Sequence, residues 1–351
     1  MRVAASAPGK LVLVGEYAVL TGAPAIVMAV DRRARVRVAN GRADGGESVV
    51  HARGGGACAA RYRFAAGRVT HAGEALPLVD SILNELVGEL ELEHAAPFAV
   101  ELDTSAFFAT SDAAGTHKLG LGSSAALTVA FASALAEYTG RLKGQEQRWI
   151  SRLISVHRRF QNGRGSGLDV AASLSGGVIS YRMNGAVERP AVAVRRLPRS
   201  FHLLAIWAGH STSTEAALER LERWHSEDPV AHDRALCELS EIATAADAAA
   251  DAGDGGALLA AMASYGDALH RFGAASGIEI YSAAHKRIAA LAHAHDAVYK
   301  PCGAGGGDIG VACSEDAAVL VALRRSIEDA GFRALALAVD PVGLQVQSSL
   351  E

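Results

Sequence analysis

The chain has 351 residues, half of them apolar and 21% charged, and its 34 basic and 38 acidic side chains leave a net charge of -4. This length is sufficient for two domains, and the balanced charge, without a basic tail or stripe, argues against a nucleic-acid partner. No apolar run is long enough to span a membrane, and Met1–Ser6 leads into a strand and not a signal peptide. We therefore expect a cytoplasmic protein without a membrane partner, either a monomer or a homodimer.

The N-terminal half opens with β structure. Alternating apolar residues predict a strand over Val3–Val14, broken at Ser6–Lys10, and two further apolar runs follow at Ala25–Val30 and Ala34–Val38. The segment Asn40–Gly56 is rich in glycine and polar residues, which indicates a hairpin tip or a surface loop.

Helices and strands then follow one another. Helical spacing of apolar residues predicts helices over Pro77–Leu92 and Gln145–Phe160, and Phe98–Leu102 predicts a strand. Two short runs, Val178–Tyr181 and Ala191–Arg196, predict a pair of strands.

The second half begins near Pro198, where we place the domain boundary. A strand at Phe201–Trp207 leads through a turn rich in serine and threonine into alanine-rich helices. The predicted helices are Glu215–Ala250, Ala257–Phe272, Tyr281–Ala294 and Glu315–Ala330. Two final strands, Ala334–Val339 and Leu344–Val346, are expected to close an α+β domain.

The segment Lys118–Ala126 is a glycine-rich entry into a predicted helix at Leu127–Tyr138. Its two glycines allow a tight turn and a close approach to a ligand, and its serines stand where the first helical amides have no internal partners. Such a helix start binds phosphate through backbone N–H groups and the helix dipole. Ser123 or Ser124 is suited to hold a metal ion or to cap the helix.

Other interpretations of this loop are less suitable. Its Gly-x-Gly-x-x-Ala string matches a loose dinucleotide-binding pattern, but polar residues at Thr110–Thr116 stand where that motif needs a strand. No Gly-Lys-Ser/Thr ends the loop, so it is not a Walker motif. An ordinary helix start with capping serines remains the alternative.

Two more glycine clusters have a similar character. Gly163–Gly167 precedes a small-residue helix at Leu168–Ser173, which gives a second candidate helix start for an anion. Gly303–Asp308 contains three consecutive glycines, which cost backbone entropy on folding. This cluster indicates either a close approach to a ligand or another backbone, or a tight hairpin.

Cysteine and histidine spacing gives no metal signal. His293 and His295 are two apart on a predicted helix and cannot share a face. The cysteines, which we expect to be inert thiols, are Cys58, Cys237, Cys302 and Cys313.

Three motifs in sequence order resemble those of the GHMP kinases, the superfamily of galactokinase, homoserine kinase, mevalonate kinase and phosphomevalonate kinase. They are Pro8–Lys10 with Gly15–Leu20, then Gly120–Ala126, then Gly303–Asp308. The resemblance implies the α+β GHMP kinase fold. Residues 1–197 would form a domain like the second domain of ribosomal protein S5, and residues 198–351 a ferredoxin-like domain, with ATP and substrate between them.

Within the superfamily the sequence is most similar to the phosphomevalonate kinases. The matching segments are His157–Arg158, Gln161, Gly163, Gly165–Ala172, Gly176–Gly177, the Ser211–Thr214 turn after Trp207, and Lys300–Pro301. Mevalonate kinases usually carry a metal-binding glutamate about eleven residues before the aspartate of the middle motif, and Arg158 stands there in this chain. This departure argues against mevalonate kinase and leaves the carboxylate ligand of the metal open.

The resemblance implies roles for individual residues. The expected ATP-binding set is Lys118, Gly120, Leu121, Gly122, Ser123, Ser124 and Ala125, with Mg²⁺ held by Ser123 or Ser124. Lys10 is the implied catalytic cation, and its alternative is a solvated surface lysine. Asp169 matches the residue taken as the base in mevalonate kinases, and its alternative is a helix cap.

A phosphorylated substrate adds negative charge, so cations and hydroxyl donors should surround it. Arg158 is the best candidate, whereas Arg159 and Arg164 are also compatible with solvated side chains. Asp308 is compatible with a simple turn cap. The expected substrate-binding set is Glu16, Tyr17, Arg158, Ser166, Gly167, Ser211, Ser213, Gly305 and Gly306.

The resulting hypothesis is ATP-dependent phosphorylation of 5-phosphomevalonate to 5-diphosphomevalonate in the mevalonate pathway of isoprenoid biosynthesis. A phosphate acceptor is mostly ionised at neutral pH, since its second pKa is about 6, so Asp169 is needed less as a base than to orient Lys10 or the substrate. Alternatives are mevalonate kinase or another small-molecule GHMP kinase. A non-catalytic ligand sensor of the same fold is expected to lack Lys10 or Asp169, and this chain keeps both.

Overall fold

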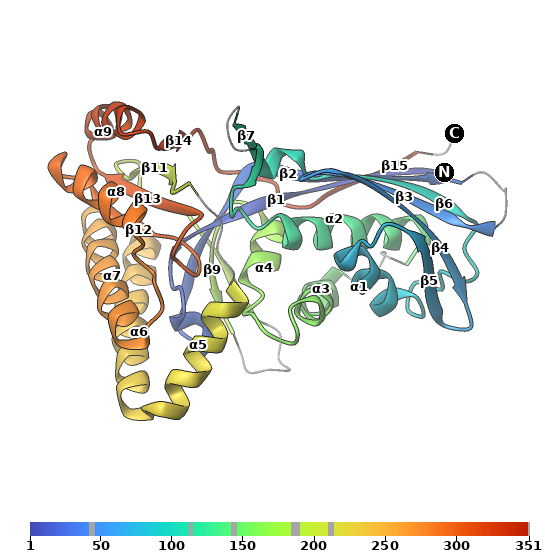
Figure 1. Ribbon diagram of the computed structural model, residues 1–351, viewed down its shortest axis with the longest axis horizontal. Coiled ribbons are helices and arrows are strands. Elements are labelled where there is room, and N and C mark those ends of the chain that lie inside the picture. The colour runs from blue at the N-terminus through green and yellow to red at the C-terminus, as the bar shows by residue number, and fades with distance from the viewer. Residues whose placement is uncertain (42–45, 112–114, 142–145, 184–189, 210–213, 350–351) are drawn as a thin grey trace.

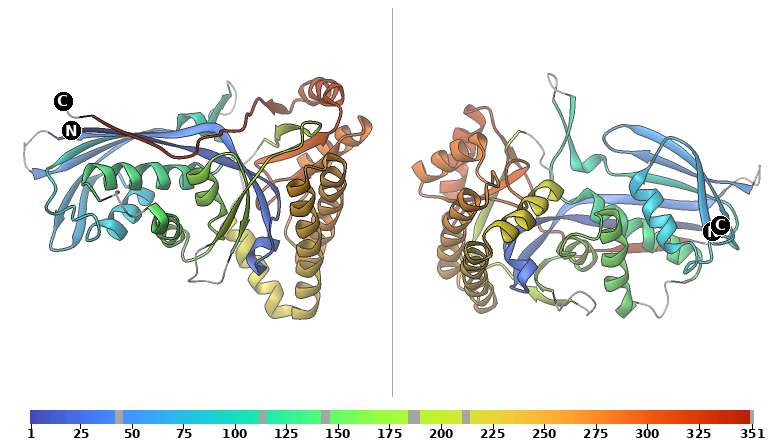
Figure 2. Two further views of the ribbon diagram at one scale, coloured as in Figure 1. Left: turned by 180° about the vertical axis from the view of Figure 1, so that it is seen from behind. Right: turned by 60° about the horizontal axis from the view of Figure 1, so that its bottom comes forward.

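The computed structural model describes residues 1–41, 46–111, 115–141, 146–183, 190–209 and 214–349. Within this described part, a nine-stranded sheet with helices on one face occupies the N-terminal half, and a four-stranded sheet with its own helices occupies the C-terminal half (Figure 1). Views from two other sides show that strands β1 and β2 run from one half to the other (Figure 2).

The long pair of β1 (Arg2–Val14) and β2 (Ala25–Asn40) forms the backbone of the large sheet. Its register shifts between Pro8 and Gly9, so the predicted break in the first strand is a β-bulge within one continuous strand. The two apolar runs predicted as separate strands are likewise joined in β2.

The other strands of the large sheet flank β2 in the order β10-β9-β2-β6-β3-β4-β5. The sequence predicts a loop over Asn40–Gly56, but the second part of that segment forms β3. The predicted pairing of β9 with β10 is confirmed. Their bounds are β3 (Ser48–Arg53), β4 (Ala57–Ala65), β5 (Arg68–Gly73), β6 (Phe98–Asp103), β9 (Val178–Arg182) and β10 (Ala191–Arg195).

Helices cover one face of this sheet (Figure 1): α1 (Pro77–Leu86), α2 (Ser123–Tyr138), α3 (Glu146–Phe160) and α4 (Leu168–Ser175). Helix α2 is buried on nearly all sides because its small residues let it pack between the sheet and the neighbouring helices. A short hairpin of β7 (Phe108–Ser111) and β8 (Gly115–Lys118) leads into the glycine loop before α2.

The C-terminal sheet has the order β12-β13-β11-β14, and every neighbouring pair is antiparallel. Its strands are β11 (His202–Trp207), β12 (Val298–Pro301), β13 (Ile309–Ser314) and β14 (Arg333–Leu335). Helices follow β11 and β13, which gives the split βαβ arrangement of ferredoxin-like domains. The predicted α+β class, with a ferredoxin-like arrangement in the C-terminal half, is therefore confirmed.

The helices of this half are α5 (Thr214–Glu227), α6 (Pro229–Ala252), α7 (Gly255–Ser276), α8 (Ala283–Ala294) and α9 (Ala317–Asp329). The prediction of one helix over Glu215–Ala250 is wrong, because Asp228 caps a new helix and Pro229 fills its first turn. Among the described residues, no helix combines the length and apolar character needed to cross a bilayer.

One cluster of buried hydrophobic residues contains side chains from both halves of the chain. Leu11 and Leu13 of β1 and Met28 of β2 belong to the same buried cluster as Tyr265 and Phe272 of α7. The division at residue 198 stays a prediction about chain organisation, since this cluster crosses it.

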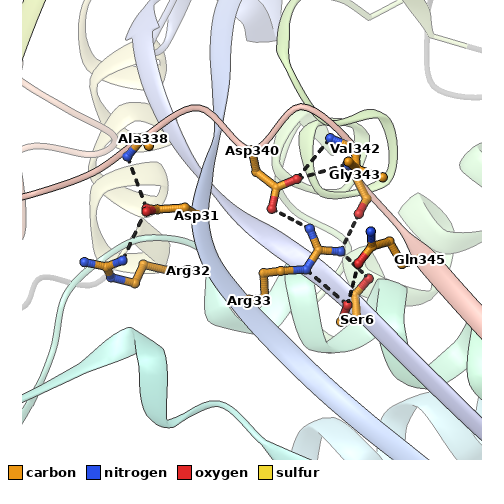
Figure 3. Close-up of polar contacts among 9 residues, drawn as sticks. All are labelled: Ser6, Asp31, Arg32, Arg33, Ala338, Asp340, Val342, Gly343 and Gln345. Carbon is orange, nitrogen blue, oxygen red and sulfur yellow. Dashed lines mark hydrogen bonds and ion pairs between the residues drawn. The ribbon is translucent and has the colours of Figure 1, made fainter.

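After β14 the chain returns to the N-terminal half. Strand β15 (Gln345–Ser349) pairs antiparallel with β1, so the prediction that Leu344–Val346 closes the C-terminal domain is wrong. Figure 3 shows how Arg33 holds the returning chain: its guanidinium pairs with Asp340 and donates to the carbonyl oxygens of Ser6 at 2.8 Å and Gly343 at 2.6 Å.

We predict that Arg33→Ala lowers the free energy of unfolding by about 3–5 kcal/mol, because it leaves the nearly buried carboxylate of Asp340 without its cation. Arg32→Ala is the matched control, since Arg32 pairs with Asp31 at the surface and should cost less than about 1 kcal/mol. Urea unfolding followed by circular dichroism measures both. Equal losses in the two variants would contradict the role of Arg33.

Candidate active site

The glycine loop before α2 is in direct contact with β1. The backbone N–H of Lys10 donates to the carbonyl oxygen of Leu121 at 2.8 Å, and a Cβ on Gly9 would lie 2.4 Å from the same oxygen. A side chain at Gly9 would therefore push the loop away. Lys10 itself lies along the loop, because a Cβ on Gly122 would be 3.0 Å from Lys10 Cγ.

The first and second motifs also meet the third. A Cβ on Gly120 would lie 2.4 Å from Cβ of Asp308, and Gly120 has a φ of 74°. The Tyr17 hydroxyl donates to the carbonyl oxygen of Ala304 at 2.6 Å. Three segments that are far apart along the chain thus converge on one place.

The start of α2 presents backbone donors at this junction. Gly122 adopts the left-handed conformation at the N-cap, and among the described residues no side chain caps the helix. The first hydrogen bond within the helix runs from Ala126 N to Gly122 O, so the amides of residues 123–125 precede it. This arrangement suits an anion such as a phosphate group.

Lys118 lies at the same junction, near Asp308 and Lys10. Desolvation lowers the pKa of the Lys118 ammonium below its ordinary value, Asp308 opposes this shift, and the positive charge of Lys10 adds to it. Two lysines close enough for their charges to interact mark a place where a negatively charged ligand would be stabilised.

A cavity of about 140 Å³ lies beside the junction. Strand β1 and the 3-10 helix η1 (Ala18–Thr21) with its preceding turn line one side, the entry to α4 lines another, and α5 and the last glycine loop complete the wall. Its polar and loop residues include Lys10, Glu16, Tyr17, Gln161, Ser166, Asp169, Thr214, Gly303 and Ala304. Lys10 and Asp169 therefore face a shared cavity.

Glu16 forms a buried ion pair across the two halves. Its Oε1 lies 2.5 Å from Nζ of Lys300, and the exposed fractions of the two residues are 4% and 0%. Burial alone would lower the pKa of Lys300, but Cys302 and Glu16 raise it above its ordinary value, so the ammonium stays charged. Oε2 of Glu16 has no hydrogen-bond partner among the described residues, although Glu16 lines the cavity. It is an acceptor left for a donor group.

Asp169 lies in the first turn of α4, after Gly167 in the left-handed conformation. Its Oδ1 accepts from the backbone N–H of Val170 at 2.9 Å, and its Oδ2 lies 3.7 Å from Nδ1 of His157. The other ring nitrogen of His157, Nε2, is 3.3 Å from Oγ of Ser124. A buried histidine therefore links the glycine loop to Asp169.

Arg158 braces a loop instead of pointing freely at the cavity. Its Nε and Nη2 donate to the carbonyl oxygens of Gly165 at 2.9 Å and Ser166 at 3.0 Å. In the part of the chain that the structure describes, Arg158 is not among the residues that line the cavity, although Gly165 and Ser166 are. Arg164 pairs with Glu219 and Glu222 on α5, and Arg159 lies 3.4 Å from Glu85.

The last glycine loop splits into two parts. Gly303 and Ala304 line the cavity, whereas Gly305 and Gly306 pack against Ile280: a Cβ on Gly305 would lie 2.7 Å from Ile280 Cα, and Gly306 N donates to Ile280 O at 2.8 Å. For Gly305 the close approach is thus to another backbone. Two expected substrate contacts, Ser211 and Ser213, lie outside the described residues.

Several cavity residues were not found from the sequence. Ala217 and Leu218 of α5 line the cavity, but alanine-rich helical spacing carries no functional signal, and Thr214 entered the sequence analysis only as the end of the Ser211–Thr214 turn. Lys300 and His157 entered the sequence analysis only as parts of matching segments, because their contacts join residues that are distant in sequence.

The fold and this convergence of glycine loops, a lysine and carboxylates define a phosphotransferase. A family model of the GHMP kinases N terminal domain matches residues 82–177. A phosphomevalonate kinase from Streptomyces sp. strain CL190 is 32% identical over 94% of this chain and 95% of its own length. The chain belongs to the GHMP kinases.

Two further comparisons bear on the fold and the subfamily. A mevalonate kinase from Thermococcus sibiricus is 26% identical over 69% of this chain and 68% of its own length. The structure of Streptococcus pneumoniae phosphomevalonate kinase in complex with phosphomevalonate and AMPPNP superimposes with a TM-score of 0.74 at 18% identity, covering 96% of this chain and 99% of that one. The protein is thus an enzyme of the mevalonate-pathway branch of the GHMP kinases.

We predict that Gly120→Ala costs about 2–4 kcal/mol of unfolding free energy, because strain at positive φ adds to the clash with Asp308. Gly140→Ala is the control: Gly140 has nearly the same φ, 71°, and a Cβ there meets nothing within 4 Å. That variant should lose only about 1–2 kcal/mol. Thermal unfolding of both variants measures the difference in stability. Equal losses of unfolding free energy would show that the second and third motifs are not in tight steric contact at Gly120 and Asp308.

Proposed function

We propose that the enzyme phosphorylates 5-phosphomevalonate to 5-diphosphomevalonate with ATP as the phosphoryl donor. The proposal is carried by the cavity that Lys10, Glu16 and Asp169 share beside the three glycine motifs. The similarity to a phosphomevalonate kinase extends over almost the whole chain, whereas that to the Thermococcus mevalonate kinase covers about two thirds. This favours the phosphorylated acceptor.

The ATP phosphates would bind at the start of α2. The backbone amides there and the charge of Lys118 suit the phosphate oxygens, and the loop from Gly120 to Ala125 would wrap around them through its backbone. Ser123 and Ser124 would hold Mg²⁺, and Ser124 is the more accessible of the two hydroxyl groups. When bound, Mg²⁺ neutralises charge on the phosphate oxygens.

Lys10 and Asp169, which both line the cavity, would serve the transfer. An oxygen of the acceptor phosphate attacks the γ-phosphorus, the new P–O bond forms, and the bond to ADP breaks. Lys10 stabilises the negative charge on the migrating group. Because the acceptor phosphate is mostly ionised at neutral pH, with a second pKa of about 6, Asp169 orients Lys10 or the substrate and is not required as a base.

The acceptor would be held by groups around the same cavity. Glu16 and Tyr17 would contribute to the cavity wall, and Oε2 of Glu16, which has no hydrogen-bond partner among the described residues, would accept a hydrogen bond from an acceptor hydroxyl. The guanidinium of Arg158, which is bonded to the cavity-lining loop at Gly165 and Ser166, would be the candidate for the acceptor phosphate. The remaining proposed contacts are Ser166, Gly167, Ser211, Ser213, Gly305 and Gly306.

A coupled assay of ADP release with 5-phosphomevalonate and with mevalonate tests the choice of acceptor. We expect turnover of 5-phosphomevalonate and at least about tenfold lower kcat/KM with mevalonate, because mevalonate lacks the charge that Arg158 would meet. Turnover of mevalonate alone would replace the proposal with mevalonate kinase. Nucleotide binding without turnover of either compound would favour a sensor.

Substitution of Lys10 and Asp169 tests their roles. Lys10→Met should lower kcat about 100-fold with little effect on the dissociation constant for ATP, since the charge acts mainly in the transition state. Asp169→Asn should retain much more activity than Asp169→Ala if the side chain orients its neighbours. If it were a base, both would lose activity alike. Lys286→Met, on the exposed face of α8, is the control and should leave kcat unchanged.

A further inference from the structure

His157 is the point at which the two sides of the proposed site touch through side chains. It lies on α3, is 1% exposed, and has Nε2 3.3 Å from Oγ of Ser124 and Nδ1 3.7 Å from Oδ2 of Asp169. Ser124 lies in the first turn of α2 and Asp169 in the first turn of α4, so three helices contribute one side chain each. No local sequence rule produces this arrangement.

The chemistry of the neighbours selects one tautomer of the imidazole. An ionised carboxylate only accepts hydrogen bonds, and a neutral imidazole carries a single N–H. The proton is favoured on Nδ1, because a lone pair there would face the negative charge of Asp169. The 3.7 Å separation exceeds a hydrogen bond, but catalytic contacts often tighten when a site fills.

This tautomer determines the direction of the Ser124 hydroxyl. With the proton on Nδ1, Nε2 can only accept, so Ser124 donates its hydroxyl proton to His157. The lone pairs of Ser124 Oγ then point away from the ring. A hydroxyl that binds a cation or a phosphate-bound metal must present those lone pairs.

We propose that His157 is a positioning residue that orients Ser124 toward the nucleotide and Asp169 toward the acceptor at the same time. Its effect on turnover rests on the proposed kinase function. The tautomer and the orientation of Ser124 do not, because they follow from contacts within the chain.

Three substitutions separate the two contacts. His157→Leu removes both while keeping apolar bulk. His157→Gln can place an amide oxygen near the Nε2 position, where it accepts from Ser124, and His157→Asn can place an amide N–H near the Nδ1 position, where it donates to Asp169. We expect the His157→Leu substitution to lower kcat and weaken ATP binding about 10–100-fold, the range seen when groups that orient a site are removed.

The partial variants should recover different quantities. Relative to His157→Leu, the His157→Gln variant should restore most of the ATP affinity, measured by calorimetry with Mg²⁺ present. The His157→Asn variant should restore more of kcat than of ATP affinity. His232→Leu is the control, because His232 is also mostly buried beside a carboxylate, Asp233, but lies outside the proposed site. It should change neither value. If all three His157 variants lose both values together and in proportion to their thermal stability, the role is structural and the proposal fails.

A spectroscopic measurement decides the tautomer without any substrate. Long-range ¹H–¹⁵N spectra of protein with labelled histidine, recorded at about pH 8.5, distinguish the Nδ1–H and Nε2–H forms of neutral imidazoles. The His157 signal is identified by its absence in His157→Leu. We expect Nδ1–H in the native protein and a shift toward Nε2–H in Asp169→Ala. An Nε2–H form in the native protein would overturn the proposal.

These measurements also separate this proposal from the proposed function. If the native protein turns over neither 5-phosphomevalonate nor mevalonate, the proposed function fails, while the tautomer and the ATP affinity still decide the role of His157.

Discussion

The close approach of β1 to the glycine loop before α2 is the constraint on which the site depends. It is possible because position 9 has no side chain and because the bulge at Pro8 and Gly9 bends the strand at that point. The backbone of Lys10 is hydrogen-bonded to the loop, and β1 pairs with β2 on both sides of the bulge. The position of the proposed catalytic lysine is thus set by the sheet and not by contacts of its flexible side chain.

A few residues after Lys10, the turn that follows β1 is bound to the C-terminal half through Glu16. The pair of Glu16 and Lys300 is fully desolvated, and such a pair costs desolvation energy that its attraction only partly offsets. What the pair contributes is specificity of arrangement, because separating Glu16 from Lys300 would leave a buried charge without its partner. Tyr265 donates to the carbonyl oxygen of Glu16, and Tyr17 reaches Ala304, so every contact aligns the turn after β1 with the C-terminal half. These contacts also fix where Oε2 of Glu16 lies, the oxygen that has no hydrogen-bond partner within the described part of the chain.

The sequence could predict what is local. Three kinds of feature depend only on short stretches of chain: the glycine clusters at helix starts, the paired strands β9 and β10, and the motifs of the family resemblance. They were sufficient to predict the α+β GHMP kinase fold. Contacts between distant segments could not be predicted in this way. The alternation in Leu344–Val346 predicts a strand but not the strand with which it pairs. The sequence likewise suggests that Arg158 is available to bind a phosphate, whereas in the structure it is hydrogen-bonded to the next loop. The link from His157 to Ser124 and Asp169 has the same origin, since three helices must pack before it exists.

The pairing of β15 with β1 also has consequences for how the chain is made. Arg2 lies opposite Ser349, so β1, which is synthesised before the other described strands, keeps part of one hydrogen-bonding edge bare until residues 345–349 have been synthesised. An exposed edge of this kind invites strand addition between nascent chains, which makes chaperone protection most valuable for this part of the sheet.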